Sequence, residues 1–143
     1  MPRLRGGVPP YKRREVAAMA RYQKLSPDGQ QIKDRLRVCV DNARMIEDLE
    51  EERRDLERMG SPEEAELRAY IGDLRREMEQ QRSRLNQWVR DTEELTCTER
   101  RILRLRYLCA SPWESIFCQL HRDRGSVYSS YRRALNKVAK HLS

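Results

Sequence analysis

Residues 67–95 read LRAYIGDLRREMEQQRSRLNQWVRDTEEL, and this stretch has the clearest periodicity in the chain. Nine positions recur at alternating spacings of four and three, and the residues between them are mostly charged or polar. The nine positions are Leu67, Ile71, Leu74, Met78, Gln81, Leu85, Trp88, Thr92 and Leu95. Such spacing is the a/d seam of a heptad repeat, and it predicts one long amphipathic helix.

A second long helix is predicted before this one. Ser26-Pro27-Asp28 has the pattern of a helix start, with Ser as the N-cap and Pro at the first helical position. Its apolar stripe comprises Ile32, Leu36, Cys39, Ala43, Ile46, Leu49 and Leu56. Gly60 ends this helix, and Ser61-Pro62 begins the next. Residues 26–94 are therefore predicted to form an antiparallel helical hairpin, coiled-coil-like in its packing.

Such a hairpin buries little surface by itself. We therefore expect it either to pack on the C-terminal part of the chain or to form a homodimer with a second copy. A single helix that is solvated along its length is the alternative to both.

Charge is distributed unevenly along the 143 residues, whose formal net charge is +7. Residues 1–25 form a basic segment that is predicted to be partly disordered at its start, with a short basic helix over residues 11–25. Residues 27–95 hold thirteen basic and nineteen acidic residues, whereas residues 96–143 hold ten basic and three acidic residues. A surface for a polyanion is therefore expected at the ends of the chain and not in its acidic middle.

Several protein classes are disfavoured by what the sequence lacks. There is no run of about 18 apolar residues, so no membrane-spanning helix is expected, and no apolar stretch follows the basic N-terminus as in a secretory signal. The cysteines are Cys39, Cys97, Cys109 and Cys118. They lack the paired spacing of a zinc site and are predicted to be small, reduced side chains in helix cores. No phosphate-binding loop or nucleophile–base pair is present, so we expect neither an enzyme nor a cofactor.

Residues 95–143 have the pattern of three shorter helices. Thr96–Glu99 and Ser111–Glu114 each have the spacing of a capping box, and Asp123 can cap a third helix. The predicted helices span residues 97–108, 112–120 and 124–142. Their expected core residues are Ile102, Leu103, Leu105, Ile116, Val127, Tyr131, Leu135 and Val138. The tight turn before the third helix predicts a helix-turn-helix domain over residues 95–143.

A series of motifs runs through this domain. They are Leu95-Thr96-x-x-Glu99, Ile102-Leu103-Arg104-Leu105-Arg106-Tyr107, Trp113-Glu114-x-Ile116, Leu120, Val127 and Ala134-Leu135-x-Lys137-Val138. The series resembles region 4 of the sigma-70 family of transcription factors. Within that group it is most similar to phage late-gene regulators of the RinA and ArpU kind. This resemblance implies double-stranded DNA as a partner, contact with RNA polymerase, and location in the cytoplasm of a bacterial host.

The third predicted helix has the composition of a recognition helix. Its candidates for contacts with base edges are Arg124, Ser126, Tyr128, Ser129 and Arg132. Arg124 is the first choice among them, because a bidentate guanidinium matches guanine. Candidates for phosphate contacts are Arg100, Arg101, Arg122, Arg133, Lys137 and Lys140. Neither Arg124 nor Lys137 belongs to the predicted core, so replacing either is expected to leave the fold intact.

Together these patterns predict a sequence-specific DNA-binding transcriptional regulator, a phage or prophage late-gene activator that acts near a promoter. Two alternatives stay open. One is a small terminase subunit or another phage DNA-packaging adaptor, which would assemble into a larger oligomer. The other is a protein that binds polymerase or a sigma factor without reading DNA.

Overall fold

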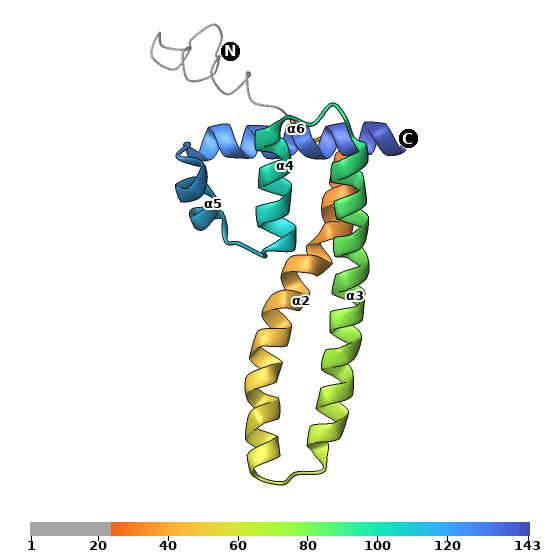
Figure 1. Cartoon of the computed structure of the whole chain (residues 1–143), viewed down its shortest axis with the longest axis vertical. Helices are drawn as coiled ribbons and strands as arrows, with labels where there is room; N and C mark the ends of the chain where they lie inside the picture. Colours follow the sequence, from red (N-terminus) through yellow and green to blue (C-terminus); the bar gives the residue numbers. More distant parts are fainter. Residues whose placement is uncertain (1–23) are drawn as a thin grey trace, which may run out of the picture.

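The computed structural model describes residues 24–143, most of which are helical (Figure 1). The elements are α2 (Pro27–Arg58), α3 (Glu63–Asp91), α4 (Cys97–Leu103), η1 (Arg104–Leu108), α5 (Trp113–Leu120) and α6 (Arg124–Leu142). No strand occurs in this range, and the predicted all-α fold of a long hairpin followed by three short helices is confirmed. Within residues 24–143, no helix combines the length and the apolar character that a bilayer crossing needs. The basic helix predicted over residues 11–25 lies outside the described residues, apart from its last two.

α2 and α3 form the predicted antiparallel hairpin. The Ser26 hydroxyl accepts a hydrogen bond of 3.0 Å from the Gly29 amide, and Pro27 occupies the first turn, as the sequence indicates. Gly60 lies in the turn at φ 66°, a left-handed conformation that favours glycine. Pro62 is the N-cap of α3 and offers no side-chain cap. Three glutamates in the first turn of α3 instead favour the positive end of the helix dipole.

The two apolar stripes meet along the hairpin and form a small core near its closed end. This core consists of Ile46, Ile71, Leu74 and Met78, with Ala43, Leu49 and Leu67 packed against it. A buried Asn42 donates a hydrogen bond of 3.1 Å from its side-chain amide to the Leu74 carbonyl. The heptad seam is therefore the inner face of α3, as its spacing predicts.

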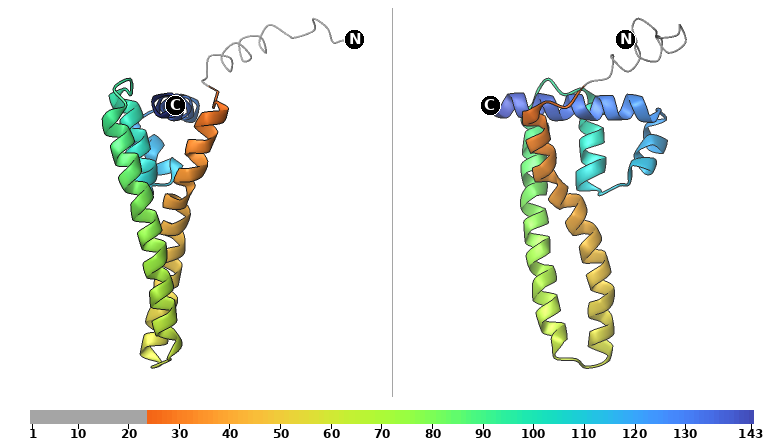
Figure 2. Two further views of the ribbon diagram at one scale, coloured as in Figure 1. Left: turned by 90° about the vertical axis from the view of Figure 1, so that its right-hand side faces the viewer. Right: turned by 180° about the vertical axis from the view of Figure 1, so that it is seen from behind.

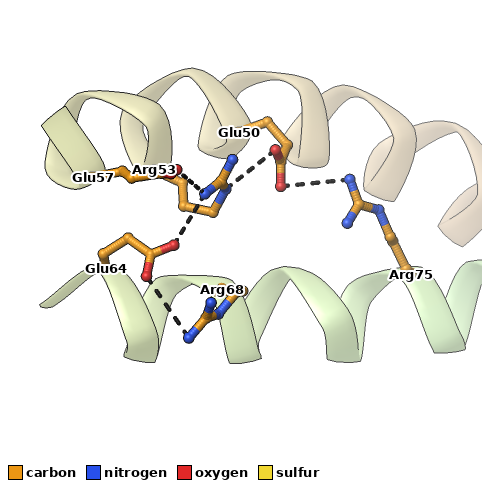
Figure 3. A network of polar contacts seen from close by, with 6 residues as sticks. All are labelled: Glu50, Arg53, Glu57, Glu64, Arg68 and Arg75. Atoms are coloured by element: carbon orange, nitrogen blue, oxygen red, sulfur yellow. Dashed lines mark hydrogen bonds and ion pairs between the residues drawn. The ribbon is translucent and has the colours of Figure 1, made fainter.

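Ion pairs tie α2 to α3 at the closed end (Figure 3). Arg53 of α2 lies 2.7 Å from the Glu57 carboxylate and 3.0 Å from the Glu64 carboxylate, which belongs to α3. Glu50 accepts a second pair across the hairpin, from Arg75 at 3.5 Å. Every charge drawn in this network has a partner of opposite sign. The side chains of Glu50, Arg53 and Glu64 are only 14–21 % exposed, so the centre of the network is shielded between the two helices.

The main hydrophobic core lies at the open end of the hairpin and includes all of the later helices. The hairpin contributes Ile32, Leu36, Cys39, Val40, Leu85 and Val89. The later helices contribute Ile102, Leu103, Tyr107, Ile116, Phe117, Val127, Tyr131, Ala134, Leu135, Val138 and Ala139. The boundary predicted between residues 94 and 95 thus runs through one continuous core. Of the two arrangements expected for the hairpin, packing on the C-terminal helices is present, and pairing with a second copy stays a prediction.

α6 crosses the open end of the hairpin, and Figure 2 shows it end-on between α2 and α3. The Asn136 side chain fixes this crossing, because its oxygen accepts from the Ser26 amide at 2.8 Å and its nitrogen donates to the Lys24 carbonyl at 2.7 Å. A Cβ on Gly29 would clash with the Asn136 side-chain oxygen, which these two hydrogen bonds hold in place. Glycine is therefore needed here for close approach.

The C-terminal helices begin largely as predicted. Thr96 and Glu99 form the expected capping box, with hydrogen bonds of 2.9 and 3.1 Å. The predicted helix over residues 97–108 is α4 followed by η1, whose wider π-type turns end with the Cys109 amide donating to the Arg104 carbonyl. Asp123 caps α6 by accepting 2.7 Å from the Ser126 amide.

The second predicted capping box does not form. Pro112 is the N-cap of α5 and makes no side-chain cap bond. Ser111 is held by the preceding element instead: its amide donates to the Leu105 carbonyl and its carbonyl accepts from Arg106. Glu114, the other half of that predicted box, pairs with Arg124.

Candidate nucleic-acid interface

The start of α6 lies beside α5, at the end of α6 that is farther from the hairpin (Figure 1). His121 turns the chain in a left-handed conformation (φ 52°), and Asp123 then caps the helix. The first turn of α6 contains no acidic residue. Two helices joined by a short turn, with the second one capped and cationic at its start, are the arrangement of a helix-turn-helix element.

Arg124 stands in this first turn and is largely exposed. Its guanidinium lies 2.6 Å from the Glu114 carboxylate and 5.7 Å from the centre of the Phe117 ring. The two charged side chains are 68 % and 73 % exposed. An ion pair this exposed contributes little to stability, so Arg124 can exchange Glu114 for another acceptor.

Aromatic side chains hold α5 against α6. The Trp113 ring contacts Tyr131 at 4.7 Å and Tyr128 at 5.0 Å between centroids, and Phe117 contacts Tyr128 at 5.4 Å. Edge-to-face pairs of this kind stabilise beyond their buried area. Tyr128, a predicted base contact, therefore packs within the element and is only partly exposed.

The other predicted base contacts differ in accessibility. Ser126 and Arg132 are half-buried, and the Arg132 guanidinium lies 5.9 Å from the centre of the Tyr128 ring. Ser129 is buried. Arg124 is thus the predicted base contact whose side chain is most open to a partner.

Four of the six predicted phosphate contacts are exposed at the surface, namely Arg101, Arg122, Arg133 and Lys140. Three of the six, Arg100, Arg133 and Lys137, contact other groups within the structure. Arg100 donates to the carbonyls of Thr92 and Leu95 and so closes the end of α3. Arg133 lies 3.8 Å from the Glu99 carboxylate.

Lys137 is the third of these engaged cations, and its environment indicates that its replacement costs stability; that the variant still folds stays a prediction. Its ammonium donates 2.7 Å to the Glu99 carboxylate, whose side chain is 1 % exposed, and 2.9 Å to the Glu94 carbonyl. A buried carboxylate without its cation is strongly destabilising. The spacing of Lys137 along α6 could not indicate this, because Glu99 precedes it by 38 residues.

A group of basic side chains in the acidic middle of the chain was not predicted from the sequence. Lys33, Arg37 and Arg44 of α2 line one cavity together with Arg106 of η1. Their spacings of four and seven place the three α2 residues on one helix face. The surplus of acidic residues in the same segment concealed this local pattern.

The cysteines correct another expectation. Cys39 is buried in the main core, but Cys97, Cys109 and Cys118 are exposed. They occupy the first turn of α4, the residue after η1 and the outer face of α5, positions that do not face the core. Within residues 24–143, no group of three or more His, Cys, Asp or Glu side chains is arranged to hold a metal ion.

No protein-family model, curated protein or solved structure matches this chain. The resemblance to sigma region 4 therefore rests on the motifs of residues 95–138 alone.

Proposed function

We propose that this protein is a sequence-specific DNA-binding transcriptional regulator that places the start of α6 in the major groove. The observation that carries the proposal is the capped start of α6, where Arg124 is exposed beside a tight turn from α5. Recognition helices contact base edges through their N-terminal residues, and a guanidinium there suits guanine.

Electrostatics supports the same surface. Residues 96–143 contain ten basic and three acidic residues, whereas the hairpin is acidic overall. Arg101 is exposed on α4, and Arg122 is exposed just before the start of α6. Neither forms an ion pair with a described carboxylate. Such cations are suited to phosphate contacts, which hold a protein on duplex DNA without reading its sequence.

The motif resemblance extends the proposal to a phage or prophage late-gene activator that works near a promoter and contacts RNA polymerase. The part of the hairpin toward its closed end would then carry the contacts with other proteins, because acidic residues outnumber basic ones there and repel DNA. A packaging adaptor and a polymerase-binding protein that does not read DNA are the alternatives that the test separates.

The test begins with selection of duplexes from a random pool by the full chain. Fluorescence anisotropy then compares a selected duplex with a scrambled one. Arg124→Ala is expected to weaken binding to the selected duplex by about 1–3 kcal/mol and to leave the scrambled duplex nearly unaffected. Arg101→Ala is expected to weaken both duplexes alike and to make the log–log salt dependence shallower by about one. Arg54→Ala, on the exposed face of the hairpin, is the matched control and should change neither.

Several outcomes would contradict the proposal. Binding that does not change between about 50 and 200 mM salt would exclude phosphate contacts. Equal loss on both duplexes after Arg124→Ala would mean that α6 is not the reading helix. A ring of many copies in light scattering would favour the packaging adaptor, since a regulator is expected as a monomer or dimer.

A further inference from the structure

A cavity of about 330 Å³ opens between α2, η1, the start of α5 and α6. Its walls carry five cationic side chains and one carboxylate. They are Lys33, Arg37, Arg44, Arg106, Arg132 and Asp41. The volume lies near the lower end of the range for small-molecule pockets, roughly 300–1,000 Å³.

The cations of this cavity are largely without acidic partners. Among the described residues, no carboxylate forms an ion pair with Lys33, Arg44, Arg106 or Arg132, and Arg37 reaches only the exposed Asp34, at 3.9 Å. The arginines at the closed end of the hairpin differ, because Arg53 and Arg75 pair with glutamates (Figure 3). Like charges that face one cavity repel one another, and a bound anion would remove that repulsion.

Two of the guanidinium groups are held in place by neighbours. Arg106 lies 4.8 Å from the centre of the Trp113 ring and donates 3.1 Å to the Ser111 carbonyl. Arg132 lies over the Tyr128 ring at 5.9 Å. Side chains fixed in this way lose less conformational entropy when a ligand binds.

Two buried tyrosines add a neutral donor to the same cavity. Tyr107 and Tyr131 line it, are 3 % and 5 % exposed, and have hydroxyl oxygens 2.5 Å apart. One hydroxyl donates its hydrogen to the other. The hydrogen of the accepting hydroxyl can then be donated to a ligand, since no acceptor for it is found among the described residues. Burial raises the pKa of both hydroxyls, so they are protonated donors at neutral pH. The positive charges of Arg106, Arg132 and Arg37 lower the pKa of Tyr131, but burial has the larger effect.

We propose that this cavity binds a phosphate group, through its arginines and the tyrosine hydroxyl pair. Guanidinium forks match phosphate oxygens with paired hydrogen bonds. Five cations against one carboxylate leave the walls with four excess positive charges. That excess favours a phosphate dianion or a pyrophosphate over a single carboxylate. The phosphate belongs either to a small soluble ligand or to a DNA backbone, and the proposal does not depend on the proposed reading function of α6.

The experiment is a calorimetric titration of the full chain with inorganic pyrophosphate, at an ionic strength held constant with sodium chloride. We expect one saturable site. Arg44→Gln and Arg132→Gln should each weaken it at least about tenfold, the loss typical of a hydrogen bond to a charged group. Arg35→Gln is the matched control, since Arg35 is an exposed cation of the same helix that does not line this cavity. It should change the affinity less than about twofold, and circular dichroism should show all variants folded.

A second arm distinguishes the two sources of phosphate. If random duplex DNA displaces pyrophosphate, and Arg44→Gln weakens both ligands, the cavity holds a backbone phosphate. If DNA and pyrophosphate bind together, the ligand is a small soluble phosphate compound. The absence of saturable heat up to millimolar pyrophosphate, or equal weakening by all three variants, would overturn the proposal. If the chain does not bind DNA, the proposed function fails, but saturable pyrophosphate binding would still support the phosphate site.

Discussion

Replacement of Lys137 by methionine removes the nearest cation from a carboxylate that is almost wholly buried. In the folded protein the Glu99 side chain is 1 % exposed, and one of its oxygens accepts from both the Lys137 ammonium at 2.7 Å and the Thr96 amide at 2.9 Å. Methionine has a similar length and no charge. The substitution therefore keeps most of the packing and removes the ion pair and the bond to the Glu94 carbonyl.

The expected loss of stability is large for one side chain. Removal of one partner from a buried ion pair destabilises a protein by roughly 3–5 kcal/mol. Two features of the site lower this value. Lys137 is 23 % exposed, so water already weakens the pair, and Arg133 lies 3.8 Å from the same carboxylate. We therefore expect a loss of about 2–3 kcal/mol, which for a chain of this size lowers Tm by about 10 °C.

Urea unfolding followed by circular dichroism measures this loss. Lys140→Met, one turn later on an exposed position of α6, is the control and should change stability by less than about 0.5 kcal/mol. A double variant with Glu99→Gln should recover part of the loss, because glutamine preserves the capping box and carries no charge. The reasoning is refuted if Lys137→Met is as stable as Lys140→Met, or if Glu99→Gln gives no recovery.

Three further predictions follow from the two cores and the cysteines. Leu85→Ala should destabilise the chain by about 3 kcal/mol, because Leu85 lies in the main core. Leu74→Ala should cost at least about 1 kcal/mol less, because Leu74 lies in the smaller core. Equal urea midpoints for the two variants would contradict this. A fragment of residues 94–143 should show no cooperative urea transition, since hairpin residues complete its core, and a sharp transition would disprove that dependence. Iodoacetamide at pH 8 should modify Cys97, Cys109 and Cys118 in the folded protein. It should modify Cys39 only after unfolding, because burial raises the pKa of that thiol to about 11; four modifications without denaturant, counted by mass spectrometry, would be inconsistent with the structure.

Features that depend on neighbouring residues were predictable from the sequence. The caps at Ser26, Thr96 and Asp123 form as expected, because each satisfies amides only three residues away. The heptad spacing of α3 likewise identified the face that packs on α2. Ser111 shows where such local reasoning ends: a hydrogen bond from Arg106 to its carbonyl, and its own amide bond to Leu105, tie it to η1 instead of α5.

The candidate sites were less predictable, because distant segments complete them. Sequence patterning identified the exposed start of α6 but could not separate a free cation from one that neutralises a buried carboxylate. Arg124 pairs with Glu114, which is exposed, whereas Lys137 pairs with Glu99, which is buried. The basic cavity was hidden for the same reason, since its walls come from segments up to about a hundred residues apart.

α2 contributes to both the main core and the basic cavity, and it thereby couples the two physically. Its stripe of Ile32, Leu36 and Cys39 belongs to the main core, while Arg37 and Arg44 on the same helix line the cavity. Across that cavity stand Tyr131 and Arg132 of α6, the helix whose first turn carries Arg124. An anion held between the two helices would stabilise the folded arrangement, by a free energy that grows with the logarithm of its concentration above Kd. Its binding would also fix the position of α6 relative to the hairpin, so that occupancy of the cavity and the orientation of the proposed reading helix are linked through the same two helices.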